Sequence, residues 1–184
     1  MGTGDLSLDE LRDYSCEYAH VVQALPRWLR QAAQATPGSA VELDRHAGEE
    51  DGDIGLWGNF AEALGVDTTV LASSKPNPAT AELLRRGDEL SAQPCGAAVA
   101  WALEVQTPAV SVEKLRGLEA YYGITSAGGG EYFDVHSRLD LVHAAELDAV
   151  ISALGTEHHA VAQRTADEMT DRLWDLLTSV ESTS

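Results

Sequence analysis

Residues 131–151 read EYFDVHSRLDLVHAAELDAVI, and this stretch decides the fold. Its apolar residues recur at roughly helical spacing, and no Gly or Pro interrupts the chain from 131 to 154, so one long helix is predicted there. The same stretch carries His136, Asp140 and His143 at positions i, i+4 and i+7. At this spacing the three side chains fall within about 40° of one another, on one face of the helix.

A face of two histidines and an aspartate has two interpretations. It is either a solvated polar stripe or part of a metal site, because imidazole nitrogen and carboxylate oxygen together suit Fe, Mn or Zn. One helix cannot complete a six-coordinate or dinuclear site, so further carboxylates must come from other helices. Asp134 and Glu146 are offset from this face and are predicted to be solvated. The adjacent His158 and His159 form a weaker candidate pair, since neighbouring helical residues point about 100° apart.

Length and charge narrow the class of protein. The chain has 184 residues, enough for one domain with a sizeable core. Its formal net charge of −18 argues against nucleic acid or an anionic membrane as a partner, because phosphates would be repelled. There is no apolar run of about 18 residues and no basic N-terminus before an apolar segment, so neither a membrane span nor a signal peptide is predicted. We expect a cytoplasmic protein.

The remaining segments are also predicted to be helical. A capping-box pattern, Ser7 with Glu10, begins the first helix, and Pro26 is expected to kink it. The predicted helices cover 8–35, 40–48, 56–64, 79–92, 95–106, 107–124, 131–154 and 156–179, with EEDGDIG breaking the chain between the second and third. Alternating patterns long enough for strands are missing. The sequence predicts an all-α, single-domain bundle of about seven helices over residues 1–184.

Two acidic features outside 131–154 bear on a metal site. Glu104 lies in AWALEVQTP, an otherwise apolar segment. Burying an unpaired carboxylate costs several kcal/mol, so Glu104 needs a cation or a metal unless it lies on an exposed face. The run EEDGD at 49–53 is the other acidic cluster, and by itself it is typical of a solvated charge run.

Taken together, these segments resemble a known family. ALEVQTPAVSVEKLRGLEAYYGI at 102–124, followed by the 131–151 stretch, is similar to the heme-oxygenase-like diiron oxidases, the iron-containing redox enzymes. Their superfamily includes thiaminase II and pyrroloquinoline-quinone synthase. Upstream, LSLDELRDY and LDRHAGEEDGDIGLW also resemble the family, so that nearly all of residues 5–154 is covered. The resemblance implies a heme-oxygenase-like fold, and we expect the chain to lack the helix that usually precedes LS-x-x-x-LR in the family.

The resemblance also implies a set of metal ligands. Carried over position by position, the set is Glu50, Asp53, Glu104, His136, Asp140 and His143. Glu49 competes with Glu50 for its place, and Asp53 stands where the family has a histidine. His46 could substitute for that histidine if the register shifted. An aspartate there would make the site more anionic, favouring a more oxidised iron or manganese, or would leave one metal position degenerate.

One further residue follows from the resemblance. Lys114 stands where several relatives have a lysine near the metal site, which makes it the candidate catalytic residue. Without the resemblance it would be interpreted as a solvated surface lysine. Tyr14, Tyr18 and Tyr132 could line a pocket, although packing in the core is the simpler role for each.

The function implied is that of an O2-dependent non-heme iron oxidoreductase. Two iron ions, with manganese as an alternative, would activate O2 to oxidise an amino-acid-like small molecule in specialised metabolism. Some relatives convert a tyrosine-derived group into an aminobenzoate, which we do not expect here because the helix supplying that tyrosine is expected to be absent. The expected partners are a small-molecule substrate, O2, and a second copy or a homologous chain. The alternatives are a metal-free enzyme like thiaminase II or the quinone synthase, and a non-catalytic partner subunit with a degenerate metal site.

Overall fold

Eight α-helices account for most of residues 6–181, the part of the chain that the computed structural model describes. They are α1 (Leu8–Ala35), α2 (Ala40–Ala63), α3 (Thr68–Ser73), α4 (Pro78–Ser91), α5 (Ala97–Glu104), α6 (Thr107–Gly117), α7 (Glu131–Ala153) and α8 (Thr156–Glu181). A π-helical turn, Leu118–Tyr122, follows α6, and no strand occurs among the described residues. The predicted all-α bundle is confirmed.

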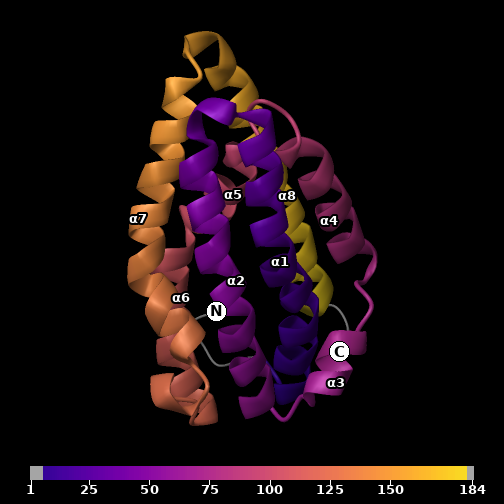
Figure 1. The fold of residues 1–184 in the computed structure, drawn as a ribbon. Helices are drawn as coiled ribbons and strands as arrows, with labels where there is room; N and C mark the ends of the chain where they lie inside the picture. The colour runs from indigo at the N-terminus through magenta and orange to yellow at the C-terminus, as the bar shows by residue number, and fades with distance from the viewer. Residues whose placement is uncertain (1–5, 182–184) are drawn as a thin grey trace.

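The helices form an elongated bundle around α5 (Figure 1). α1 packs along α2, α6 along α7, and α8 against α4 and α5. α5 also contacts α1 and α7, so this short helix lies against both the α1–α2 pair and the α6–α7 pair. Its buried face is built from alanines, including Ala98 and Ala102, which let neighbouring helices approach closely. Glu104, the last residue of α5, is thereby placed inside the bundle.

α1 begins with the capping box that its sequence predicts. The Ser7 hydroxyl accepts a hydrogen bond from the Glu10 backbone N–H at 3.2 Å, and the Glu10 carboxylate accepts one from the Ser7 N–H at 2.6 Å, which confirms the capping box. The helix continues through Pro26 and ends at Ala35. Its Trp28 packs on α4 so closely that a Cβ added at Gly87 would lie 2.2 Å from the indole.

The predicted break in the second helical segment is wrong. Residues 40–48 and 56–64 belong to one helix, α2, and the acidic run between them is helical. Each glycine inside a helix costs about 1 kcal/mol, and burial of one face of α2, including Leu43, Trp57 and Phe60, outweighs the summed cost. The continuity has a consequence for function, because it places His46, Glu50 and Asp53 at i, i+4 and i+7. None of the described helices is long and apolar enough to cross a membrane.

Candidate metal centre

Seven buried polar side chains from three helices meet inside the bundle. α2 and α7 each contribute three at the same i, i+4, i+7 spacing, and α5 contributes its final residue. The seven are His46, Glu50, Asp53, Glu104, His136, Asp140 and His143, and none is more than 5% exposed. We call this set the carboxylate–histidine cluster.

One half of the cluster is centred on two histidines. His46 Nε2 lies 3.2 Å from Glu104 Oε1 and 3.5 Å from Glu50 Oε1. His143 Nδ1 lies 3.4 Å from the same Glu50 oxygen and 3.8 Å from Glu104 Oε2. The two imidazole rings are 3.8 Å apart between centroids. One potential ligand atom from each of these four residues lies within 4.8 Å of the other three, close enough to share one metal ion.

The other half contains one histidine and more oxygen. His136 Nε2 lies 3.2 Å from Asp53 Oδ2 and 4.0 Å from Asp140 Oδ1. Ligand atoms of Glu50, Asp53 and His136 also lie within 4.8 Å of one another. Glu50 therefore belongs to both halves, and a carboxylate so placed can bridge two metal ions.

Hydrogen bonds fix which ring nitrogens face the cluster. His136 Nδ1 donates a hydrogen bond to the backbone oxygen of Tyr132 at 2.7 Å. In the neutral ring this leaves the lone pair of Nε2 facing the cluster. His143 Nε2 lies 2.9 Å from Glu49 Oε2, which leaves Nδ1 facing Glu50 and Glu104. Metal-binding histidines commonly show this pattern, in which the second nitrogen is held by a carboxylate or a carbonyl.

The inward-facing atoms of the cluster lack hydrogen-bond partners within the described residues. They are His46 Nε2, Glu50 Oε1, Asp53 Oδ2, both Glu104 carboxylate oxygens, His136 Nε2, Asp140 Oδ1 and His143 Nδ1. Buried polar atoms are rarely left unpaired, because each one costs about 1–3 kcal/mol. Imidazole nitrogens and carboxylate oxygens that converge without partners fit metal ions in chemistry and in position.

The electrostatics lead to the same conclusion. Burial, with the nearby Glu104 and Glu50, raises the pKa of Asp140 to about 8, although His136 acts to lower it. Burial lowers the pKa of His46, but its ionic contacts with Glu104 and Glu50 outweigh this and raise the value to about 10. In the absence of other cations, protons therefore supply the positive charge that so many buried carboxylates require. Metal ions would replace those protons.

All six residues predicted as metal ligands are brought together, and His46 joins them. The α7 face is buried rather than a solvated stripe, and Glu104 is not at an exposed position. Glu49 does not compete with Glu50, because it lies on the far side of His143. His46 is a full member of the cluster and needs no shift in register. The sequence signal was H-x3-E-x2-D on α2, which has the spacing of H-x3-D-x2-H on α7.

Lys114 is not a solvated surface lysine. Its ammonium donates to the Tyr14 hydroxyl at 2.5 Å and lies 4.5 Å from the Tyr14 ring centre, 5.5 Å from that of Tyr18 and 5.7 Å from that of Phe133. Burial of this amine lowers the pKa of Lys114 to about 8. Next to the cluster, Tyr132 stacks on the His136 ring at 4.0 Å.

The cavity beside the cluster is small. Tyr18, Tyr132, Glu50, Glu104 and Asp140 are among its lining residues, and its volume is about 10 Å³. This is room for about one water molecule, so a molecule the size of an amino acid does not fit.

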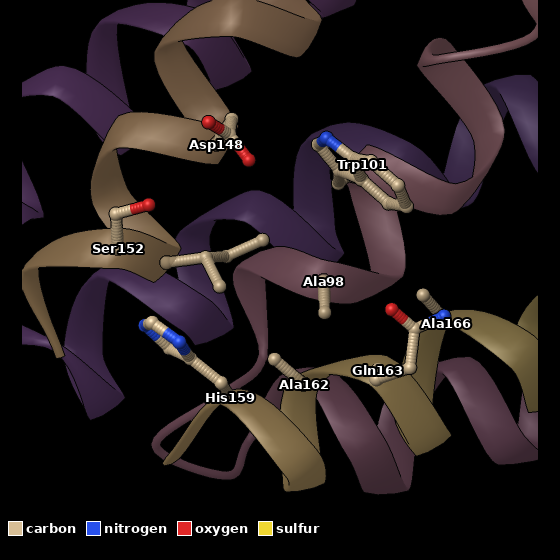
Figure 2. Close-up of a pocket in the computed structure, with 9 residues that line it drawn as sticks. Ala98, Trp101, Asp148, Ser152, His159, Ala162, Gln163 and Ala166 are labelled. Atoms are coloured by element: carbon tan, nitrogen blue, oxygen red, sulfur yellow. The ribbon is translucent and has the colours of Figure 1, made fainter. Parts of the chain in front are cut away.

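A larger groove lies elsewhere, between α5, α7 and α8. Figure 2 shows Trp101, Asp148 and His159 around this groove, whose volume is about 220 Å³ and whose lining includes no member of the cluster. His159 faces the groove, whereas His158 Nδ1 donates to the Leu154 carbonyl at 2.9 Å. The two adjacent histidines thus have different surroundings, as their spacing predicts.

Comparisons with known proteins identify the family to which the chain belongs. A sequence profile described as "Iron-containing redox enzyme" matches residues 12–175. A 4-aminobenzoate synthase from Chlamydia pneumoniae is 31% identical over 96% of this chain and 83% of its own length. A 4-aminobenzoate synthase from Nitrosomonas europaea is 27% identical over 96% of this chain and 80% of its own length.

Two solved structures share the fold. A TenA homologue from Pseudomonas syringae pv. tomato superposes with a TM-score of 0.82 at 18% identity, over 95% of this chain and 80% of that one. A domain of unknown function with a heme oxygenase-like fold, from Shewanella denitrificans, gives a TM-score of 0.83 at 18% identity, over 97% of this chain and 80% of that one. The fold is therefore heme-oxygenase-like, and the chain belongs to the iron-containing redox enzyme family.

Proposed function

We propose that this member of the iron-containing redox enzyme family is a non-heme diiron oxidase with aminobenzoate-type chemistry. The observation that carries the proposal is the convergence of seven buried side chains whose inward atoms have no hydrogen-bond partner among the described residues. The names of the relatives, 4-aminobenzoate synthases, supply the reaction class. Iron bound in the cluster would supply the reduction of O2 that such an oxidation needs.

The ligands divide into two positions. His46, His143 and Glu104 would hold one ion, and Asp53, His136 and Asp140 would hold the other, with Glu50 between them. Manganese remains an alternative at the position with more oxygen ligands, because harder ions prefer oxygen. Three helices, α2, α5 and α7, set the spacing of these side chains.

Residues around the cluster exclude water and position aromatic rings. Val21, Val22, Leu25 and Leu103 close the small cavity on its apolar side. The Lys114 amine lies 5.5 Å from the centre of the Tyr18 ring and bonds to Tyr14. A phenol ring and an amine are thus held next to an oxidising site, which supports the assignment of Lys114 as a catalytic residue.

The source of the oxidised ring has two candidates. An external amino-acid-like molecule would need the bundle to open, since the cavity holds only about 10 Å³. A tyrosine of the chain itself needs no opening. α1 carries Tyr14 and Tyr18 beside the site, so a ring donor does not require a helix before α1. The small cavity favours the internal tyrosine.

The test is a single turnover of reconstituted protein. The chain is loaded anaerobically with Fe(II), its metal is counted, and O2 is added while visible absorption is followed. Two iron ions per chain and a transient absorption band are expected, and both should be lost in His143→Ala. Less than one metal per chain would instead favour a partner subunit with a degenerate site. Activity that persists after chelation would favour a metal-free acid–base enzyme.

Isotope labelling identifies the ring. Protein grown with ring-labelled tyrosine should release labelled 4-aminobenzoate, and the intact mass of the chain should fall. Tyr18→Phe should abolish the product, whereas Tyr121→Phe, at a position 56% exposed, should not. Unlabelled product with an unchanged chain mass would show that the ring comes from an external substrate.

A further inference from the structure

The cluster is linked to the surface through one of its histidines. His143 Nδ1 faces Glu50 and Glu104, while its Nε2 lies 2.9 Å from Glu49 Oε2. Glu49 is adjacent in sequence to Glu50, but its side chain points to the other edge of the imidazole and is 39% exposed. It therefore contacts a proposed ligand without reaching the metal position.

Glu49 is itself held in place. Its Oε1 accepts a hydrogen bond from Arg45 Nη1 at 2.6 Å, one helical turn earlier on α2. The other terminal nitrogen of Arg45 bonds to Glu146 on α7. The chain of contacts runs from Glu146 through Arg45 and Glu49 to His143, and it joins α2 to α7 across the edge of the cluster.

The two ring nitrogens of His143 cannot exchange roles in this arrangement. A carboxylate is only an acceptor when ionised, so Nε2 must carry the proton that bonds to Glu49. Nδ1 is then deprotonated in the neutral ring and can donate its lone pair to a cation. The negative charge of Glu49 also makes the imidazole a stronger base, and carboxylates in this position typically change metal affinity by about 10–100-fold.

We propose that Glu49, fixed by Arg45, is a positioning residue that sets His143 as an Nδ1 metal ligand and strengthens its bond to the ion. This inference rests on the proposed function, because it requires a metal at the cluster. Glu49 is not a ligand, and its effect passes entirely through His143. The role is specific to one metal position, since His136 is instead held by the backbone oxygen of Tyr132.

The chain offers a matched control on the same helix. Asp51 pairs with Arg30 on the surface of α2, and its side chain is 47% exposed. Glu49 and Asp51 lie two residues apart, and each forms an ion pair with an arginine. Glu49→Gln and Asp51→Asn each remove the negative charge of one such pair. Only the first removes the partner of a cluster histidine. A general effect of charge on metal binding would therefore appear in both variants, and an effect through His143 in one.

The experiment measures Zn(II) and Co(II) binding to metal-free wild type, Glu49→Gln and Asp51→Asn. Calorimetry gives the affinities, and Co(II) absorption reports the ligand field. Wild type and Asp51→Asn should agree within about twofold, and Glu49→Gln should lose about 10-fold or more at one position. In the Zn(II)-loaded protein, the proton signal of the His143 Nε2–H should lie downfield and exchange slowly with water. It should move upfield in Glu49→Gln only.

The outcomes separate this inference from the proposed function. If wild type binds neither ion, the metal centre fails and this inference fails with it. If wild type binds both ions but Glu49→Gln matches Asp51→Asn in affinity and in the His143 signal, Glu49 has no positioning role and the metal centre stands. Retained metal-free stability in Glu49→Gln, measured by urea unfolding, shows that the loss of affinity does not come from misfolding.

Discussion

The buried amine of Lys114 should make stability depend on pH in a way that one substitution removes. Each pKa unit is worth about 1.4 kcal/mol, so the fall from 10.5 to about 8 corresponds to a cost of about 3 kcal/mol for holding the ammonium in the fold at neutral pH. Contacts of the ammonium with the Tyr14 and Tyr18 rings offset part of it. Lys114→Met removes that cost but leaves the Tyr14 hydroxyl without its partner, worth about 1–3 kcal/mol.

The sign follows from proton binding. Between pH 8 and 10.5 the unfolded chain holds a proton on Lys114 that the folded chain has lost, so the contribution of Lys114 to stability rises with pH in this window. Relative to Lys114→Met, wild type should gain about 1 kcal/mol of unfolding free energy from pH 7 to pH 9.

The assay is urea unfolding of metal-free protein at pH 7, 8 and 9. The chain has only one other lysine, Lys75, which is exposed, so Lys75→Met is a matched control that should differ from wild type equally at each pH. A wild-type to Lys114→Met difference that is constant over this range would show that the amine keeps its ordinary pKa, and the reasoning from burial would be refuted.

Three further predictions concern the cluster and the packing. Zn(II) binding to metal-free protein should release protons, because burial raises the pKa of Asp140 to about 8 and the contacts of His46 with Glu104 and Glu50 raise its pKa to about 10. Calorimetry in buffers of different ionisation enthalpy should therefore show more than one proton per chain. Glu104→Gln should weaken Zn(II) binding at least about tenfold while changing metal-free unfolding little, since burial already raises the pKa of Glu104; undiminished affinity would remove it from the ligand set. Gly87→Ala should lower the free energy of unfolding in urea by about 1–3 kcal/mol, because its Cβ would meet Trp28. Gly58→Ala, with open space around it, should be neutral or stabilising. Equal effects of the two substitutions would contradict the close packing of Trp28 on α4.

The long α7 helix was predictable because local sequence and tertiary packing agree there. Its apolar spacing is unbroken, and its His-Asp-His face needed only helical geometry to be recognised. α2 was not predictable in the same way. Its acidic, glycine-rich middle favours a break locally, and only the burial of residues on either side, such as Leu43 and Trp57, makes the helix continuous.

Site residues could be predicted from the sequence where they share one face of a single helix, because their spacing along the chain is then enough to bring them together. The inward orientation of the Lys114 amine was not predictable, because the chain around it, SVEKLRG, has no pattern that distinguishes an inward lysine from an outward one. Its environment is made by Tyr14 and Tyr18, about a hundred residues earlier. The choice between Glu49 and Glu50 also required the rotation of α2 relative to α7, which no single segment contains.

The resemblance places a histidine where this chain has Asp53, and we propose that this position still holds a metal ion. An abandoned ligand would be expected to turn to solvent, yet Asp53 is 5% exposed and its Oδ2 lies inside the cluster, 3.2 Å from His136 Nε2. His46, one turn before Glu50, restores the lost imidazole on the opposite half of the cluster, where its ring lies against that of His143. We propose that the nitrogen donors are redistributed rather than lost, which would leave one softer metal position and one harder one. We propose that a partner subunit without metal would not retain that arrangement, because seven converging buried polar groups are costly to the fold unless protons or metal ions neutralise their charge.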